Sequence, residues 1–107
     1  MQVPLEHFSM LAGNAAVNTR TADSGNVLAT SFCSGCGSTL FADNTARPRV
    51  RTVHIGSLDD PTAVEVAAHI WVKQKLQWMV LPGAHRKFNE AGDWTSDYSN
   101  DPSRYGV

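Results

Sequence analysis

Five consecutive residues, Cys33-Ser34-Gly35-Cys36-Gly37, contain both cysteines of this 107-residue chain. They lie between two runs that favour β structure, residues 27–32 and 38–42, so the segment is predicted to be a turn between two strands. Glycine at position 37 permits a positive φ, which lets backbone N–H groups point towards the sulfurs. Two cysteines at this spacing are typical of half of a structural zinc site, which takes four tetrahedral ligands. The sequence therefore predicts a zinc knuckle with two ligands still to be supplied.

A redox pair of cysteines is one alternative for the same spacing. A thioredoxin-type pair begins a helix, whose N-terminus lowers the thiol pKa. The residues from Gly37 to Phe41 would make a poor first helical turn and a good strand. A metal knuckle is therefore favoured, and a redox pair or a knuckle that has lost its metal stay open as alternatives.

Short runs of β-favouring residues, separated by Gly, Pro, Asn and Asp, recur along the chain at the spacing of a small sandwich or open barrel. The fold class is therefore predicted to be mostly β. A hairpin is expected from residues 16–21 and 27–32, because the intervening Asp23-Ser24-Gly25-Asn26 tolerates positive φ. Other strands are expected at residues 7–11, 38–42, 50–55, 67–72 and 76–81. A helix over residues 62–72 is the competing prediction there.

Composition excludes several classes of partner. The formal net charge is −1, and the basic residues are scattered, so neither nucleic acid nor an anionic membrane is an expected partner. The first residues lack the pattern of a signal peptide, and no run of about 18 apolar residues could span a membrane. A cytoplasmic protein is predicted, with a β domain at residues 1–88 and a polar tail at residues 89–107 that carries Trp94, Tyr98 and Tyr105.

Three motifs, in order along the chain, resemble the glutathione-dependent formaldehyde-activating enzyme family, which includes centromere-protein-V-like domains. They are the segment 32–41 around the cysteines, the segment 55–61 (Ile-Gly-Ser-Leu-Asp-Asp-Pro), and His69-Ile70-Trp71-Val72 with Trp78. The likeness runs from about residue 3 to residue 88. It implies a β-tent-like fold of small antiparallel sheets with zinc. For some members it also implies a carbon-sulfur lyase activity that joins formaldehyde to glutathione.

The family pattern has two further cysteine segments. An early C-x-C-G completes the structural zinc site together with the later pair, and a C-x-C-x-x-C segment holds a catalytic zinc. Neither segment occurs in this sequence, which resembles the C-terminal two thirds of the family's domain, so a domain shortened at its N-terminus is expected. The resemblance therefore carries over only Cys33 and Cys36, as structural zinc ligands, and no catalytic residue.

Two sources are considered for the ligands that would complete the site. A two-fold homodimer could place one cysteine pair from each chain on its axis. Alternatively, histidines of the same chain could bind, since two cysteines with two histidines also hold zinc. The candidates are His7, His54, His69 and His85. His54 and His69 lie in expected strands and are predicted to be hydrogen-bonded structural residues, whereas the other two flank turns and are expected to be exposed.

Other side chains are assigned structural roles. Loss of N-terminal strands would leave sheet edges uncovered, which favours an oligomer, with the tail aromatics as candidates to cover them. Trp71 and Trp78 are expected to pack in the core, with the lining of a small-molecule pocket as the alternative. Asp59 and Asp60, before a proline, are expected to form a turn or a cap instead of an acid-base pair.

Two functions of different classes follow. One is a zinc-binding relative of carbon-sulfur lyases of the S-hydroxymethylglutathione synthase type that lacks the catalytic zinc, with glutathione or a small thiol as its ligand. The other is a non-catalytic binding or assembly module built on the same β scaffold.

Overall fold

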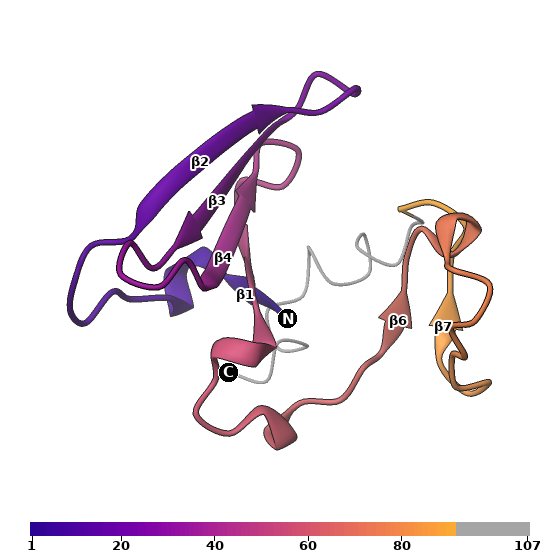
Figure 1. Cartoon of the computed structure of the whole chain (residues 1–107). Coiled ribbons are helices and arrows are strands. Elements are labelled where there is room, and N and C mark those ends of the chain that lie inside the picture. Colours follow the sequence, from indigo (N-terminus) through magenta and orange to yellow (C-terminus); the bar gives the residue numbers. More distant parts are fainter. Residues whose placement is uncertain (92–107) are drawn as a thin grey trace.

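The computed structural model describes residues 1–91, which form a five-stranded antiparallel sheet and a short two-stranded pair (Figure 1). The strands of the large sheet are β1 (Gln2–Pro4), β2 (Ala16–Thr21), β3 (Val27–Phe32), β4 (Thr39–Asn44) and β5 (Val50–Val53). Their order across the sheet is β1-β5-β4-β3-β2. Within residues 1–91 the helical elements are 3-10 turns of three residues each, so the mostly β prediction is confirmed.

The predicted hairpin is confirmed, and both of its strands have the predicted ends. Strands β2 and β3 pair without interruption from Ala16 opposite Phe32 to Thr21 opposite Val27. Gly25 adopts a φ of +88° in the connecting turn, a conformation that costs glycine little because it has no Cβ. The turn therefore sets the register of the hairpin, as expected from its composition.

The core lies at the centre of the large sheet, on β4 and β5. Phe41 on β4 and Val50 at the start of β5 are buried, at 7% and 8% exposure, as is Pro4 on β1. The Phe8 ring meets Phe41 edge to face, with centroids 4.9 Å apart. The Arg51 guanidinium lies over both rings, 4.6 Å from the Phe8 centroid and 4.2 Å from that of Phe41. The Arg51 guanidinium therefore covers the two aromatic rings of this small core, a place that a second sheet takes in a β-sandwich.

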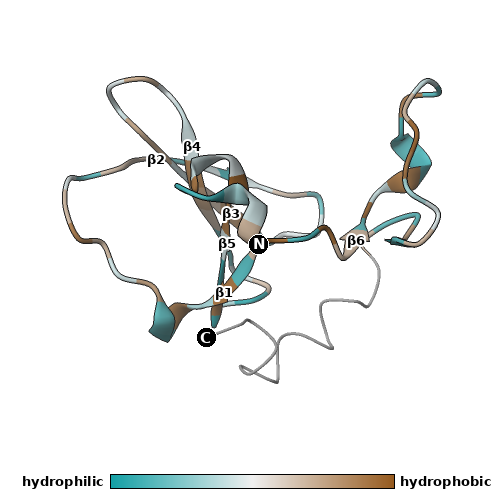
Figure 2. Cartoon of the chain, turned by 90° about the horizontal axis from the view of Figure 1, so that it is seen from below, coloured by the Kyte–Doolittle hydropathy of each residue, from teal (hydrophilic) through white to brown (hydrophobic). Residues whose placement is uncertain are grey.

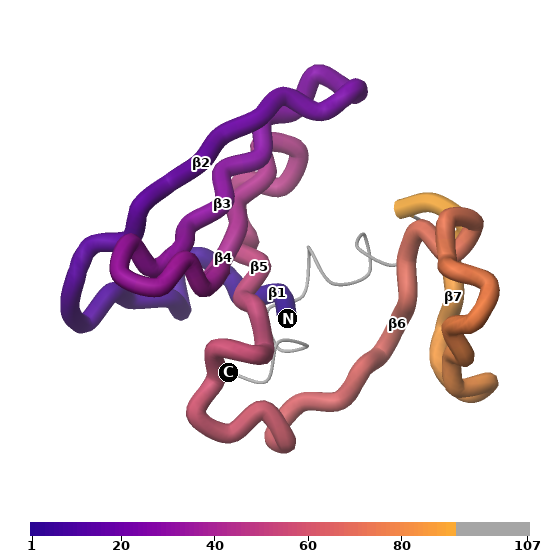
Figure 3. The backbone as a smooth tube through the Cα atoms, in the orientation of Figure 1, coloured from indigo at the N-terminus to yellow at the C-terminus, as the bar shows by residue number. Residues whose placement is uncertain are grey.

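The second sheet is a parallel pair of two-residue strands, β6 (Ala68–His69) and β7 (Arg86–Lys87). It lies apart from the large sheet, beyond a connecting segment that contains the 3-10 turns η2 (Ile55–Ser57) and η3 (Pro61–Ala63) (Figure 1, Figure 3). Apolar stretches also occur on the chain beyond β6 (Figure 2). Several of these apolar side chains are exposed, Trp78 at 76% and Val80 at 91%.

Several predicted elements differ from the structure. Residues 7–11 are not a strand: the 3-10 turn η1 (Leu5–His7) leads into an irregular loop, in which Leu11 is 96% exposed. The predicted strand 67–72 is shortened to β6, because Trp71 takes a left-handed conformation with φ +56° and turns the chain into η4 (Val72–Gln74). Residues 76–81 form no strand, and no helix spans residues 62–72. Apolar composition alone did not distinguish a buried strand from this exposed loop.

None of the helices in the described part of the chain is long and apolar enough to cross a membrane. The predicted tail residues Trp94, Tyr98 and Tyr105 lie outside the described residues.

Candidate metal site at Cys33 and Cys36

The turn between β3 and β4 holds the two cysteines, as the sequence predicts. Two backbone hydrogen bonds close it: Gly37 N–H donates to the Cys33 carbonyl at 2.7 Å, and Cys33 N–H donates to the Ser38 carbonyl at 2.8 Å. Gly37 has a φ of +79°, so the positive φ expected at this position is confirmed. The strand register shifts between Ser31 and Phe32, immediately before the turn. The two thiols are therefore presented by a closed, local structure.

The two thiols differ in their surroundings. Both are free, with Cys33 half-buried and Cys36 exposed. The Ser38 hydroxyl, whose oxygen lies 3.2 Å from Cys36 Sγ, contributes most to lowering the pKa of the Cys36 thiol. The Ser38 backbone N–H and a hydrogen bond from the Cys33 side chain lower this pKa further. These donors stabilise the thiolate, which is the form that binds metals.

This donor set fits two of the four positions of a structural zinc site. The sulfurs are soft ligands that zinc accepts, and they are close enough to share a hydrogen bond. Across residues 1–91, however, three or more histidine, cysteine, aspartate or glutamate side chains nowhere converge in a way that could hold a metal ion. The remaining ligands of a zinc at the cysteines would therefore come from outside this part of the chain.

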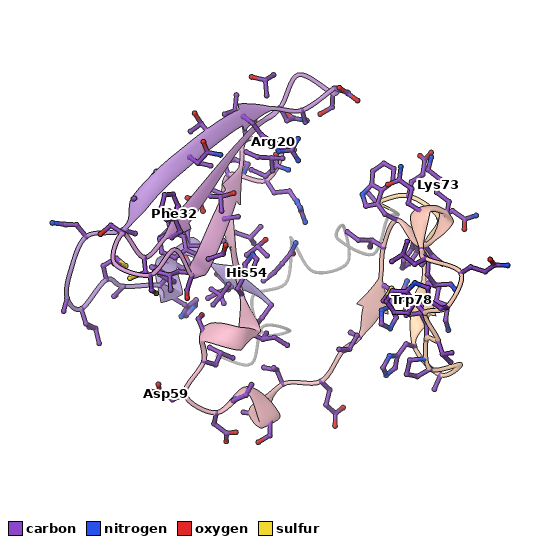
Figure 4. The ribbon with its side chains drawn as sticks, viewed as in Figure 1. Arg20, Phe32, His54, Asp59, Lys73 and Trp78 are labelled. Carbon is purple, nitrogen blue, oxygen red and sulfur yellow. The ribbon has the colours of Figure 1, made fainter. Side chains whose placement is uncertain are left out.

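The four histidines do not join the cysteines. His7 is exposed, as expected, and its Nε2 lies 3.8 Å from a carboxylate oxygen of Glu6. His54 was expected inside a strand, but it follows β5, is exposed, and precedes η2 (Figure 4). His69 and His85 instead meet each other, with 3.0 Å between His69 Nε2 and His85 Nδ1. The structural hydrogen bond predicted for His69 is thus confirmed, whereas His85 is half-buried and not exposed.

The other candidate residues take structural or surface positions. The Asp60 side chain caps η3 by accepting hydrogen bonds from the Thr62 backbone N–H, at 3.1 Å, and from the Thr62 hydroxyl. Of the two roles predicted for this aspartate, a turn or a cap, the structure confirms the cap. Trp71 and Trp78 are 44% and 76% exposed, so the prediction that they pack in the core is wrong. Figure 4 shows Trp78 on the part of the molecule beyond β6, away from Phe32 and the large sheet.

The family model for the glutathione-dependent formaldehyde-activating enzyme matches residues 1–74. That range includes β1 to β6, both cysteines and the turn that closes around them. No curated protein and no solved structure matches the chain. The family match covers more than half of the 107 residues and agrees with the motifs in the sequence. The chain belongs to the glutathione-dependent formaldehyde-activating enzyme family.

Proposed function

We propose that this protein binds a structural zinc ion through Cys33 and Cys36. The observation that carries the proposal is the closed turn that presents both sulfurs, with a lowered pKa at Cys36. Zinc bound there would fix the end of the β3–β4 hairpin, since structural zinc contributes directly to folding free energy.

A second copy of the chain is the proposed source of the other two ligands. A two-fold axis beside the turn would bring two identical cysteine pairs together and complete a tetrahedral four-cysteine site. The exposure of Cys36 leaves its sulfur accessible to such a partner. The proposed assembly is therefore a homodimer, in a cytoplasmic environment that keeps thiols reduced.

The proposed role is zinc binding and assembly, not turnover by this chain alone. Family membership relates the protein to carbon-sulfur lyases of the S-hydroxymethylglutathione synthase type and suggests glutathione or another small thiol as a ligand. A catalytic zinc needs at least three protein ligands, and such a cluster is not found in residues 1–91. The alternative, a binding module that holds no zinc, uses the same β scaffold.

Native mass spectrometry of protein purified without chelator tests the proposal. One zinc per two chains is expected, and the Cys33→Ser and Cys36→Ser variants should lose both zinc and dimer. The His54→Ala variant is the matched control and should keep both, because within the described residues this exposed side chain does not join the two cysteines in a group that could hold a metal. Metal-free monomers of the unmodified chain would refute zinc binding and favour the binding module. One zinc per chain would refute the shared site.

A further inference from the structure

The parallel pairing of β6 and β7 brings two histidines together from opposite ends of a long loop. His69 ends β6, and His85 immediately precedes β7. Backbone hydrogen bonds fix both positions: Phe88 N–H donates to the His69 carbonyl at 2.9 Å, and Arg86 N–H donates to the Ala67 carbonyl at 3.3 Å. The two imidazoles are thus held on adjacent segments, although they are 16 positions apart in sequence.

The imidazoles meet through ring nitrogens. His69 Nε2 and His85 Nδ1 are 3.0 Å apart, while the ring centroids are 5.2 Å apart and the ring planes differ by 26°. Metal–imidazole bonds are about 2.0–2.1 Å long, so two such nitrogens on one ion at a tetrahedral or square-planar angle lie about 2.9–3.4 Å apart. The observed separation falls in that range. In the metal-free pair one ring N–H donates to the other ring nitrogen. Release of that proton would free both nitrogens for an ion that lies off the line between them.

We propose that His69 and His85 form a two-histidine site for a divalent transition-metal ion, with Cu²⁺ and Ni²⁺ as the best-suited ions. Imidazole nitrogen favours these metals, and Cu²⁺ binds nitrogen ligands most tightly in the divalent series. Both side chains are half-buried, so water can complete the coordination shell. The site is separate from the cysteine pair and does not depend on the zinc proposal, because histidines and cysteines do not converge within the described residues.

The ligand type, and not the neighbouring charge, explains why a transition metal fits this site better than a hard cation. Arg86 and Lys87 follow His85 directly, and the Lys87 ammonium donates to the carbonyls of Pro82 and His85 at 2.7 and 3.0 Å. These cations repel any divalent ion, so its binding has to come from the bonds to imidazole nitrogen. Mg²⁺ and Ca²⁺ take carboxylate and carbonyl oxygens, whereas Cu²⁺ and Ni²⁺ gain strong bonds from imidazole nitrogen.

Calorimetric titration with NiCl₂ tests the proposal, since thiols do not reduce this ion. The chain is used after alkylation with iodoacetamide, which blocks the cysteine sulfurs, and a Cys33→Ser/Cys36→Ser variant serves as an independent background. One Ni²⁺ per chain is expected to bind. His69→Phe and His85→Phe should each weaken binding about 10-fold or more, because each leaves one ligand where two acted together. His54→Phe is the matched control and should match the parent.

The two phenylalanine variants keep an aromatic ring at each position, and circular dichroism checks that they remain folded. Copper electron paramagnetic resonance on the alkylated chain then counts the nitrogen ligands, with two expected in the parent and one in each single variant. Equal Ni²⁺ affinity in the parent and both histidine variants would overturn the proposal. Absence of Ni²⁺ binding by the alkylated, folded chain would also overturn it.

Discussion

Arg51 combines two kinds of contact in the five-stranded sheet. Its Nε and Nη2 donate to the two carboxylate oxygens of Asp43, both at 2.9 Å, and its guanidinium lies over the rings of Phe8 and Phe41. The side chain is 19% exposed, so both contacts are partly shielded from water. Planar two-point contact with a carboxylate and stacking on aromatic rings are properties of arginine that lysine does not share. This one side chain therefore connects β4, β5 and the loop that carries Phe8.

Arg51→Ala should lower the free energy of unfolding by about 1–3 kcal/mol, because it removes the two ring contacts and the paired hydrogen bonds. Arg51→Lys should recover only part of this loss. Urea unfolding followed by circular dichroism measures both changes. Arg20→Ala, at an exposed position of β2, is the control and should shift stability by less than about 0.5 kcal/mol. Equal effects of the Arg51 and Arg20 variants would contradict this role.

The Lys73–Glu90 pair predicts a specific pH dependence. The Lys73 ammonium donates to Glu90 at 2.6 Å, and this hydrogen bond, followed by the attraction between the charges, lowers the pKa of the Glu90 carboxyl. A lowered folded-state pKa stabilises the folded chain above the ordinary glutamate pKa, and this contribution disappears as pH falls through the lowered value. In Lys73→Ala the Glu90 pKa should return towards its ordinary value, as measured by carboxyl NMR titration. Lys75→Ala, whose ammonium contacts backbone carbonyls instead, should leave the Glu90 pKa unchanged.

Among the elements, the turn between β3 and β4 depends most directly on one glycine. Gly37→Ala should destabilise the chain by about 1 kcal/mol, because a Cβ is strained at positive φ, and it should weaken the proposed zinc binding at the adjacent sulfurs. Gly35→Ala is a matched control in the same turn: its added Cβ would lie 3.7 Å from Cys33 Sγ, an ordinary contact. Thermal unfolding and zinc titration of the two variants should separate them. Similar losses in both would show that the conformation of Gly37 is not the cause.

Two elements of the fold could be predicted from the sequence alone. The β2–β3 hairpin and the cysteine turn were predictable because their determinants are local: turn residues at 23–26, and a glycine placed after the second cysteine. The strands predicted at 38–42 and 50–55 are present as Thr39–Asn44 and Val50–Val53, with shifted ends. In this site, the Ser38 contact with Cys36 was not predicted, because it depends on how the turn closes.

The predictions that were wrong depend on contacts between residues far apart in the sequence. Residues 67–72 and 76–81 are apolar enough for buried strands, but burial depends on what packs against them, and Trp71 instead turns the chain. The pairing of β6 with β7 joins two-residue segments, too short to leave a periodic pattern. The His69–His85 contact follows from that pairing. Because the sequence does not reveal the pairing, it does not predict that these two histidines meet.

For the whole molecule, we expect proteases to cut first in the segment between η3 and β6, which connects the large sheet to the β6–β7 pair. Glu65 and Val66 are exposed, and Figures 1 and 3 show this segment between the large sheet and the β6–β7 pair. Exposed connecting segments are preferred sites of proteolysis. Glutamyl endopeptidase should therefore cut first after Glu65, and the fragment 1–65 should keep the β circular dichroism of the five-stranded sheet. Time-resolved mass spectrometry follows the order of cleavage, and a first cut after Glu6 or Glu90 would contradict the expectation.

The position of the cysteine turn within a hairpin of neighbouring strands also has a consequence for the order of folding. Its two strands, β3 and β4, are separated by only six residues, so closing this loop costs little chain entropy compared with the pairing of β1 and β5. The sulfurs should therefore be brought together early, before the sheet is complete. The proposed zinc site shared by two chains would then join hairpins that each chain has already formed, so zinc would act at assembly and not at the first folding step.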